Sequence, residues 1–173
     1  YGETLPELFG SAIPITSCIA DQHAALFAQG CRENGMAKLT NGTGSFLDLN
    51  IGENSVGMDG ADTVVAWKIN GKICYAIEGY AAVTGSAVQW VRDGLKFIKS
   101  SSEIEELADS VLDTNGVYFV PALAGLGAPY WDPFARGMII GLTRGVTNAH
   151  IARAVLQSIA FSIKLPNNTV KSA

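Results

Sequence analysis

Two stretches of the chain show the alternation of apolar and polar residues that is typical of β-strands. Residues 36–52, MAKLTNGTGSFLDLNIG, predict two strands on either side of a glycine turn, and residues 63–79, TVVAWKINGKICYAIEG, predict a hairpin around Asn70-Gly71. An Asn-Gly pair is a strong local hairpin signal because both residues tolerate the positive φ that a tight turn requires. We therefore expect three consecutive antiparallel strands in this part of the chain.

Apolar residues at helical spacing predict four helices. The first follows Asp21 and ends near residues 33–35, ENG, and the second covers residues 84–100, TGSAVQWVRDGLKFIKS. Residues 101–112, SSEIEELADSVL, open with a Ser-x-x-Glu capping box, and residues 147–164 form a last helix capped near Asn148. The second helix should bury one face consisting of Ala87, Trp90, Val91, Leu95 and Ile98.

The remaining segments complete the predicted fold. Residues 13–20, IPITSCIA, indicate a buried strand that ends at Asp21, and residues 116–123 and 138–142 indicate two further strands. This order of elements mixes parallel and antiparallel pairing, so the class is α/β, with a mixed β-sheet flanked by helices. We expect a connector over residues 1–12 and an irregular tail over residues 164–173, which is polar and contains a proline.

Composition and charge exclude several classes of protein. Hydrophobic residues make up 48% of the 173 residues and charged residues 16%, which is typical of a globular domain with a well-buried core. The net charge is −4 and no Lys/Arg cluster is present, so nucleic acid is not expected as a partner. The apolar runs are too short to span a membrane, and three widely spaced cysteines match neither a zinc site nor a disulfide framework. We expect a soluble cytoplasmic protein.

Asp21 lies where the predicted strand 13–20 gives way to a helix. As an N-cap it would accept N–H groups from the first turn and stay ionised. An ionised carboxylate in this position can also act as a base in phosphoryl transfer, because the loose transition state requires little proton abstraction. His23 and His150 have no partner pattern in the sequence, which favours structural roles for both.

Three further segments could carry chemistry. Residues 41–46, NGTGSF, form a glycine-rich turn that could let backbone N–H groups approach a phosphate, although the segment taken alone favours an ordinary hairpin turn. Residues 83–90, VTGSAVQW, begin a helix whose free N–H groups could receive a phosphate, or which is simply a capped helix. Residues 125–137, GLGAPYWDPFARG, form a long loop that is either functional or packed over a satellite core, with Asp132 and Arg136 paired.

Taken together, these segments resemble the FGGY carbohydrate kinases. IADQHAALFAQG, NGTGSFLDLNIG, YAIEGYAAVTGSAVQWVRDGLK, NGVYFVPALAGLGAPYWDPFARG and GLTRGVTNAHIARAVLQSIAF stand in the order of that family. The resemblance covers residues 13–163 and implies an incomplete C-terminal domain with a ribonuclease H-like, actin-like ATPase fold. GAPYWDPFARG and the Asp21-Gln22 pair point to the branch of the family that phosphorylates glycerol.

The resemblance also implies roles for single residues. It assigns the catalytic base to Asp21, which would lie near Mg²⁺ as well, in contact with the ion directly or through water. Gln22 would line the polyol pocket, with Phe46 against the glycerol carbons. Nucleotide binding falls to four residues: Thr43, Gly44, Gly85 and Gln89. Asn41, Ser45 and His23 differ from the residues usual in the family, without removing a functional group.

The implied activity is ATP-dependent phosphorylation of glycerol to sn-glycerol 3-phosphate, with ATP and Mg²⁺ as cofactors and a homo-oligomer as the full-length state. Family members are about three times as long as this chain, and their amino-terminal domain supplies most glycerol contacts. We therefore expect the chain alone to be inactive. The alternatives are a pentulose kinase or other FGGY sugar or polyol kinase, and a non-catalytic nucleotide-binding module.

Overall fold

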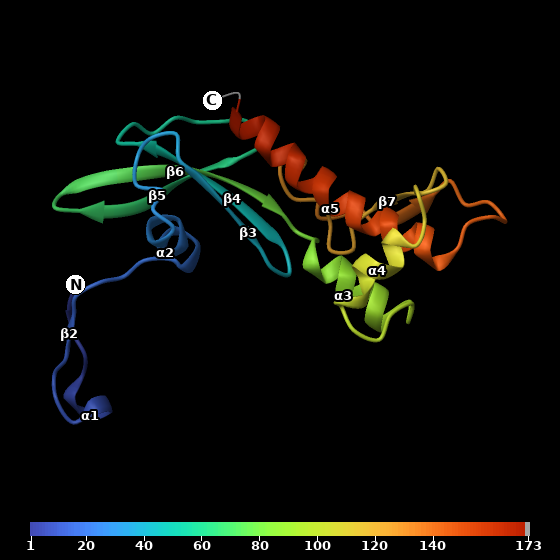
Figure 1. The fold of residues 1–173 in the computed structure, drawn as a ribbon. Coiled ribbons are helices and arrows are strands. Elements are labelled where there is room, and N and C mark those ends of the chain that lie inside the picture. The colour runs from blue at the N-terminus through green and yellow to red at the C-terminus, as the bar shows by residue number, and fades with distance from the viewer. Residues whose placement is uncertain (172–173) are drawn as a thin grey trace.

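The computed structural model describes residues 1–171. Figure 1 shows an N-terminal arm, a central sheet and a mostly helical part at the far end of the sheet. The elements in chain order are β1 (Gly2–Glu3), α1 (Pro6–Phe9), β2 (Pro14–Ile15), α2 (Asp21–Ala28), β3 (Ala37–Asn41), β4 (Ser45–Gly52), β5 (Asp62–Ile69), β6 (Lys72–Ala81), α3 (Gly85–Asp93), α4 (Glu103–Asp109), β7 (Tyr118–Val120), β8 (Met138–Ile140) and α5 (Asn148–Lys171).

The central sheet has the strand order β3-β4-β6-β5, and each neighbouring pair is antiparallel. Both predicted hairpins are confirmed. Asn70 and Gly71 have φ values of 52° and 84°, the positive values that a two-residue turn between β5 and β6 requires. The sheet therefore follows directly from the local pattern of residues 36–81.

The two faces of the sheet are covered differently. Helix α2 packs on one face, where Leu26 and Cys31 contact Ala66 and Ala76. On the other face Leu47 and Ile77 belong to a second apolar cluster, and α5 packs against β6 and β4. Because successive residues of a strand point to opposite faces, Phe46, Asp48 and Asn50 lie on the α2 face.

A larger core lies beyond the sheet, where α5 packs against α3, α4 and β7. Val91, Phe119 and Val155 are buried there, and the rings of Trp90 and Phe119 stack with centroids 5.5 Å apart. All five residues of the predicted helical face pack into this core. Helix α3 nevertheless ends at Asp93 rather than near residue 100, because the glycine at position 94 interrupts it.

Three expectations differ from the structure. Residues 13–20 contribute only the short strand β2, which pairs with β1, and they are exposed rather than buried in a sheet (Figure 1). The named strand pairs within residues 1–171 are all antiparallel, so the expected parallel pairing does not form among them. The α/β class with flanking helices is confirmed.

The expected irregular tail is the third difference. Helix α5 continues to Lys171, so the prediction is wrong for residues 164–171, and residues 172–173 lie outside the described part. A proline favoured an earlier stop, but extending a helix already packed on a sheet avoids the cost of nucleation. Among the residues that the structure describes, no helix combines the length and apolar character needed to span a membrane.

Candidate active site

The first turn of α2 presents Asp21 and Gln22. The preceding residue, Ala20, has extended backbone angles and occupies the N-cap position, so Asp21 is the first helical residue rather than the cap itself. Its Oδ1 still accepts the N–H of Gln22 at 2.8 Å, which satisfies one free donor of the first turn. The carboxylate is exposed and Gln22 is half-buried. The helix start thus leaves Asp21 open to a ligand.

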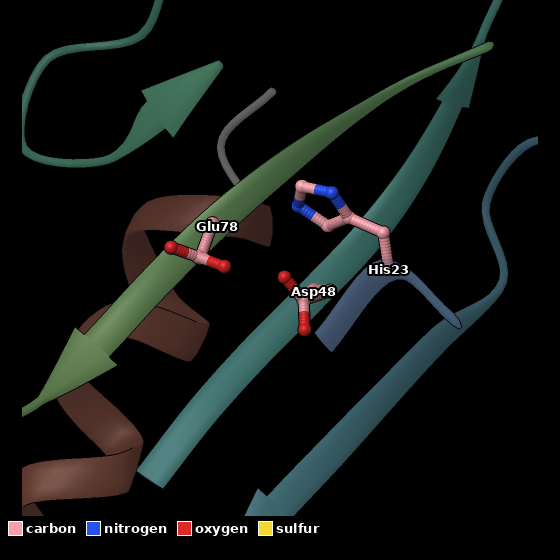
Figure 2. A group of neighbouring side chains, drawn as sticks. All are labelled: His23, Asp48 and Glu78. Atoms are coloured by element: carbon pink, nitrogen blue, oxygen red, sulfur yellow. The ribbon is translucent and has the colours of Figure 1, made fainter. Parts of the chain in front are cut away.

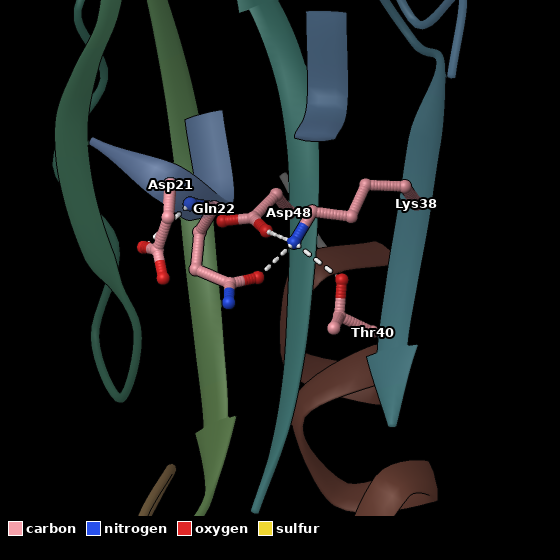
Figure 3. A network of polar contacts seen from close by, with 5 residues as sticks. All are labelled: Asp21, Gln22, Lys38, Thr40 and Asp48. Carbon is pink, nitrogen blue, oxygen red and sulfur yellow. Dashed lines mark hydrogen bonds and ion pairs between the residues drawn. The ribbon is translucent and has the colours of Figure 1, made fainter. Parts of the chain in front are cut away.

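Lys38 ties this turn to the sheet (Figure 3). It lies on β3, is almost completely buried, and its ammonium group contacts three side chains, two through hydrogen bonds and one as an ion pair. The Nζ atom is 2.5 Å from Asp48 Oδ2, 2.5 Å from Gln22 Oε1 and 2.9 Å from Thr40 Oγ1. Register explains the pairing with Asp48, because Lys38 and Asp48 are directly opposite one another on β3 and β4.

Asp48 also belongs to an acidic cluster with Glu78 of β6 and His23 of α2 (Figure 2). One ligand atom from each of the three side chains lies within 4.8 Å of the others. Burial and, after it, the neighbouring Asp48 raise the pKa of Glu78 to about 7, while Lys38 opposes the shift. Asp48 Oδ1 is buried without a donor among the described residues, and a protonated Glu78 is the group that can supply one.

The cluster carries the features of a proton-sharing carboxyl pair more than those of a metal site. Lys38 already places a full positive charge on Asp48, so a second cation would be repelled at this position. His23, predicted to be structural, does pack beside this pair. His150 caps the start of α5, where its Nδ1 lies 2.8 Å from Thr147 Oγ1.

Phe46 lies two residues before Asp48 on the same face of β4. Its ring packs against Tyr80 of β6 with centroids 4.6 Å apart. The residues predicted to contact the acceptor therefore share one face of the sheet, with Gln22 above it and Phe46 within it. From Asp48 to Gly44 the strand covers about 13 Å, so this face leads directly into the glycine-rich turn.

The turn between β3 and β4 is joined to the start of α3 by main-chain hydrogen bonds. Gly85 N donates to Gly42 O at 3.0 Å, and Ser86 N donates to Thr43 O at 3.0 Å. A Cβ atom on Gly85 would lie 2.3 Å from Gly42 O, and one on Gly44 would lie 2.8 Å from Ala81 O. Both positions require glycine because the backbones approach so closely. The structure thus brings Thr43, Gly44 and Gly85 together.

This junction corrects one expectation about α3. The N–H groups of Gly85 and Ser86 are used by carbonyls of the turn, so they are not free to receive a phosphate. The N–H groups of Thr43 and Gly44 take part in no hydrogen bond within residues 1–171, and they remain open for one. Gln89, one turn further along α3, is exposed. The unpaired N–H groups of this region therefore lie on the turn rather than at Gly85 and Ser86.

The long loop between β7 and β8 is not a satellite core. Tyr130 is 60% exposed and Phe134 is 83% exposed, so the packed interpretation is wrong. Asp132 accepts the N–H groups of Phe134 and Ala135, and Arg136 donates to carbonyls of Pro133 and Ala135, so the expected Asp132–Arg136 pair does not form. Ala128 N donates to Tyr80 O at 2.8 Å, which fastens the loop to β6.

Comparison with known protein families shows which family this chain belongs to. A model of the C-terminal domain of the FGGY family of carbohydrate kinases matches residues 37–170. The chain belongs to this family. The family membership expected from the sequence motifs is therefore confirmed, and the matched range includes the glycine-rich turn, α3 and the long loop.

Individual FGGY proteins agree with this assignment. Glycerol kinase 2 of Thermotoga maritima is 56% identical over 165 residues, which cover 95% of this chain and 33% of that protein. Plasmodium falciparum glycerol kinase, solved with ADP, superposes with a TM-score of 0.82 at 40% identity, covering 92% of this chain and 32% of that one. Xylulose kinase from Rhodospirillum rubrum shares the fold, with a TM-score of 0.73 at 23% identity. The chain spans about a third of the length of these relatives.

Sequence reasoning missed Lys38, Asp48 and Glu78. Each is a charged residue within a predicted strand, and each shares its face of the sheet with apolar neighbours. Asp48 stands between Leu47 and Leu49, so the alternation of residues 47–51 already indicated that it lies on the face opposite to these leucines. That signal was available, but its partners could be named only once the strand register was known.

Proposed function

We propose that the full-length protein containing this chain transfers the γ-phosphoryl group of ATP to a terminal hydroxyl of glycerol, giving sn-glycerol 3-phosphate. The observation that carries this proposal is the placement of Asp21 and Gln22 over the sheet face that leads into the Thr43–Gly44 turn. Relatives named glycerol kinase, at 55–57% identity, support glycerol as the acceptor.

Asp21 would act as the base. Its carboxylate takes the proton from the attacking hydroxyl, whose oxygen forms a bond to the γ-phosphorus while the bond from that phosphorus to the β-phosphate oxygen breaks. ADP then leaves with the electron pair of that bond. Because the transition state is loose, positioning contributes more than the strength of the base. Phe46 would contact the carbon chain of the acceptor.

Thr43 and Gly44 would bind ATP phosphates through their open N–H groups, with Gly85 holding the turn in place. Gln89, exposed on the same helix start, would reach the nucleotide from α3. This division assigns the nucleotide to the turn and the acceptor to α2.

Mg²⁺ fits the donor chemistry of this site. Asp21 offers a hard carboxylate oxygen that is exposed, and its Oδ2 has no hydrogen-bond donor among residues 1–171. Asp21 would hold the ion, directly or through water. When bound, Mg²⁺ neutralises charge on the transferring phosphate.

The acceptor can be tested with the full-length protein and a panel of polyols and pentuloses at fixed ATP. We expect the highest kcat/KM for glycerol. A higher kcat/KM for a pentulose would overturn glycerol and favour the pentulose kinase alternative, while leaving the family unchanged.

The chain of 173 residues is expected to be inactive alone, because catalysis by positioning needs groups on both sides of the substrate. Asp21 and Thr43 are both exposed, so this face is open. A coupled assay of ADP formation with glycerol checks this, and turnover by the chain alone would contradict it.

Two further properties belong to the same proposal. We place the full-length protein in the cytoplasm, as a homo-oligomer that is a dimer or a tetramer. Exposed apolar side chains on β7 and β8, including Tyr118, Met138 and Ile140, support an association surface. Light scattering of the full-length protein measures the oligomeric state.

A further inference from the structure

The orientation of the Gln22 amide is fixed by chemistry. Lys38 has three N–H donors and no acceptor, so only Oε1 of Gln22 can face Nζ at 2.5 Å. The amide nitrogen is consequently turned away from Lys38, as Figure 3 shows. It makes no hydrogen bond to another residue in the described part of the chain.

Lys38 itself has little freedom. It is 4% exposed, Asp48 is completely buried, and the ammonium group makes two hydrogen bonds and one ion pair. Removing such a pair from water costs several kcal/mol per ion, and apolar residues of similar volume are often as stable. A buried pair at this place is therefore poorly explained by stability alone.

We propose that Lys38, held by Asp48, is a positioning residue that presents the Gln22 amide N–H groups to an acceptor hydroxyl beside Asp21. This inference rests on the proposed function. A hydroxyl oxygen between the two side chains would receive a hydrogen bond from Gln22 while its proton faces Asp21. The pair of side chains thus selects a group that both donates and accepts, which is the property of an alcohol.

Lys38 also contacts the strand that leads into the proposed phosphate-binding turn. Its third donor binds Thr40 Oγ1, and Thr40 directly precedes the turn that begins at Asn41. One ammonium group therefore links the acceptor residue on α2 to the strand that leads into the phosphate turn. Loss of this link should weaken acceptor binding first, because Gln22 is held by Lys38 whereas the turn has its own main-chain hydrogen bonds.

The test uses the full-length protein and a Lys38→Met/Asp48→Leu double variant, which removes the pair without leaving a buried charge. We expect the KM for glycerol to rise by roughly tenfold, with the KM for ATP unchanged within about twofold. A matched control is Lys72→Met, which removes an exposed ion pair with Glu53 and should change neither constant. Equal changes in both KM values, or none, would overturn the proposal.

Coupling to Gln22 separates positioning from a general structural role. In a Gln22→Ala background, the double substitution should add less than about twofold to the glycerol KM, because its route of action is already removed. An additive effect would overturn the inference. If the double variant does not fold, the glycerol KM of Lys38→Arg tests the proposal instead. It keeps the ion pair but moves the donor, so an unchanged glycerol KM would again overturn the proposal.

Failure of the inference and failure of the proposed function give different results. If the unmodified protein does not phosphorylate glycerol, the proposed function fails. If it does so and the Lys38 variants behave like Lys72→Met, only the positioning role fails.

Discussion

Around the first turn of α2, side chains hold the candidate site together, whereas at the turn before β4 the main chain does. Gln22 is fixed by Lys38, and Lys38 by Asp48, through three side-chain contacts. Thr43 and Gly44 are fixed because main-chain groups of the turn and the start of α3 bond to each other. Side-chain contacts can change with single substitutions, whereas a main-chain junction depends on glycine at two positions.

This difference matches the two proposed ligands. The side-chain part of the site, around α2, would recognise the acceptor, and the main-chain part, at the turn before β4, would recognise phosphate. Phosphates are the same in every reaction of a kinase, so backbone N–H groups suffice for them. An acceptor alcohol varies between family members, and discrimination between acceptors requires side chains placed for a particular hydroxyl. The following substitutions test the side-chain part and the main-chain part of the site separately, in order of decreasing effect.

Asp21→Ala in the full-length protein should give the largest effect. Loss of a general base should lower kcat by about a thousandfold, since such groups contribute 10²–10⁴-fold. Binding of ATP measured without Mg²⁺ should be retained, because Asp21 is proposed to contact the acceptor and the ion while the Thr43–Gly44 turn binds the phosphates. Steady-state kinetics and nucleotide titration measure the two quantities.

The control is Asp59→Asn, which changes an exposed carboxylate in the loop before β5. Full activity of Asp21→Ala would contradict the assignment of the base, whereas ATP binding without turnover by the unmodified protein would favour a non-catalytic nucleotide-binding module.

Gly85→Ala should disrupt the main-chain junction between the β3–β4 turn and the start of α3. The added Cβ would lie 2.3 Å from Gly42 O, so the turn and α3 must separate. We expect a loss of about 3 kcal/mol in the free energy of unfolding and a higher KM for ATP. Denaturant unfolding and kinetics at saturating glycerol check this.

Gly57→Ala serves as the matched control, since a Cβ there meets nothing within 4 Å. Equal stability of the two alanine variants would show that the junction is not as tight as the distances indicate.

Glu78→Gln should give the smallest effect, and only at a defined pH. The pKa of Glu78 is raised from 4.5 to about 7, so between these values the folded state binds a proton that the unfolded state has released. The free energy of unfolding of the unmodified protein therefore falls as pH rises through this window. Glu78→Gln keeps a neutral group at every pH and should not show this fall.

Thermal unfolding at about pH 5 and about pH 8 measures this pH dependence. Between the two pH values, the Tm of the unmodified protein should fall more than the Tm of Glu78→Gln. Glu33→Gln, at an exposed position, is the control. Parallel pH dependence of the unmodified protein and Glu78→Gln would mean that Glu78 is ionised throughout.

Local sequence determined much of the fold. The Asn70-Gly71 turn, the two strands beside the glycine-rich turn and the start of α5 all follow from patterns within a few residues. The same is true of Asp21 at the start of α2 and of the glycines at positions 44 and 85. These features depend on φ, on alternation and on helix boundaries, which neighbouring residues decide.

Other features could not be found locally. Residues 13–20 have the composition of a buried strand, but a strand is buried only if another element covers it, and here the segment is exposed. Helix α3 ends at Asp93, yet Leu95 and Ile98 still reach the core predicted for them. Apolar pattern therefore indicated which residues are buried more reliably than it indicated helix length.

The sequence by itself determined which residues we propose for the chemistry, because the family motifs contain Asp21, Gln22, Thr43 and Gly44 in a fixed order. Only the tertiary structure decided how they are held. The register of β3 against β4 sets Lys38 opposite Asp48, and the packing of α2 on that face brings Gln22 to the same ammonium group. Contacts between residues so far apart in the chain depend on the packed sheet, which no local pattern records.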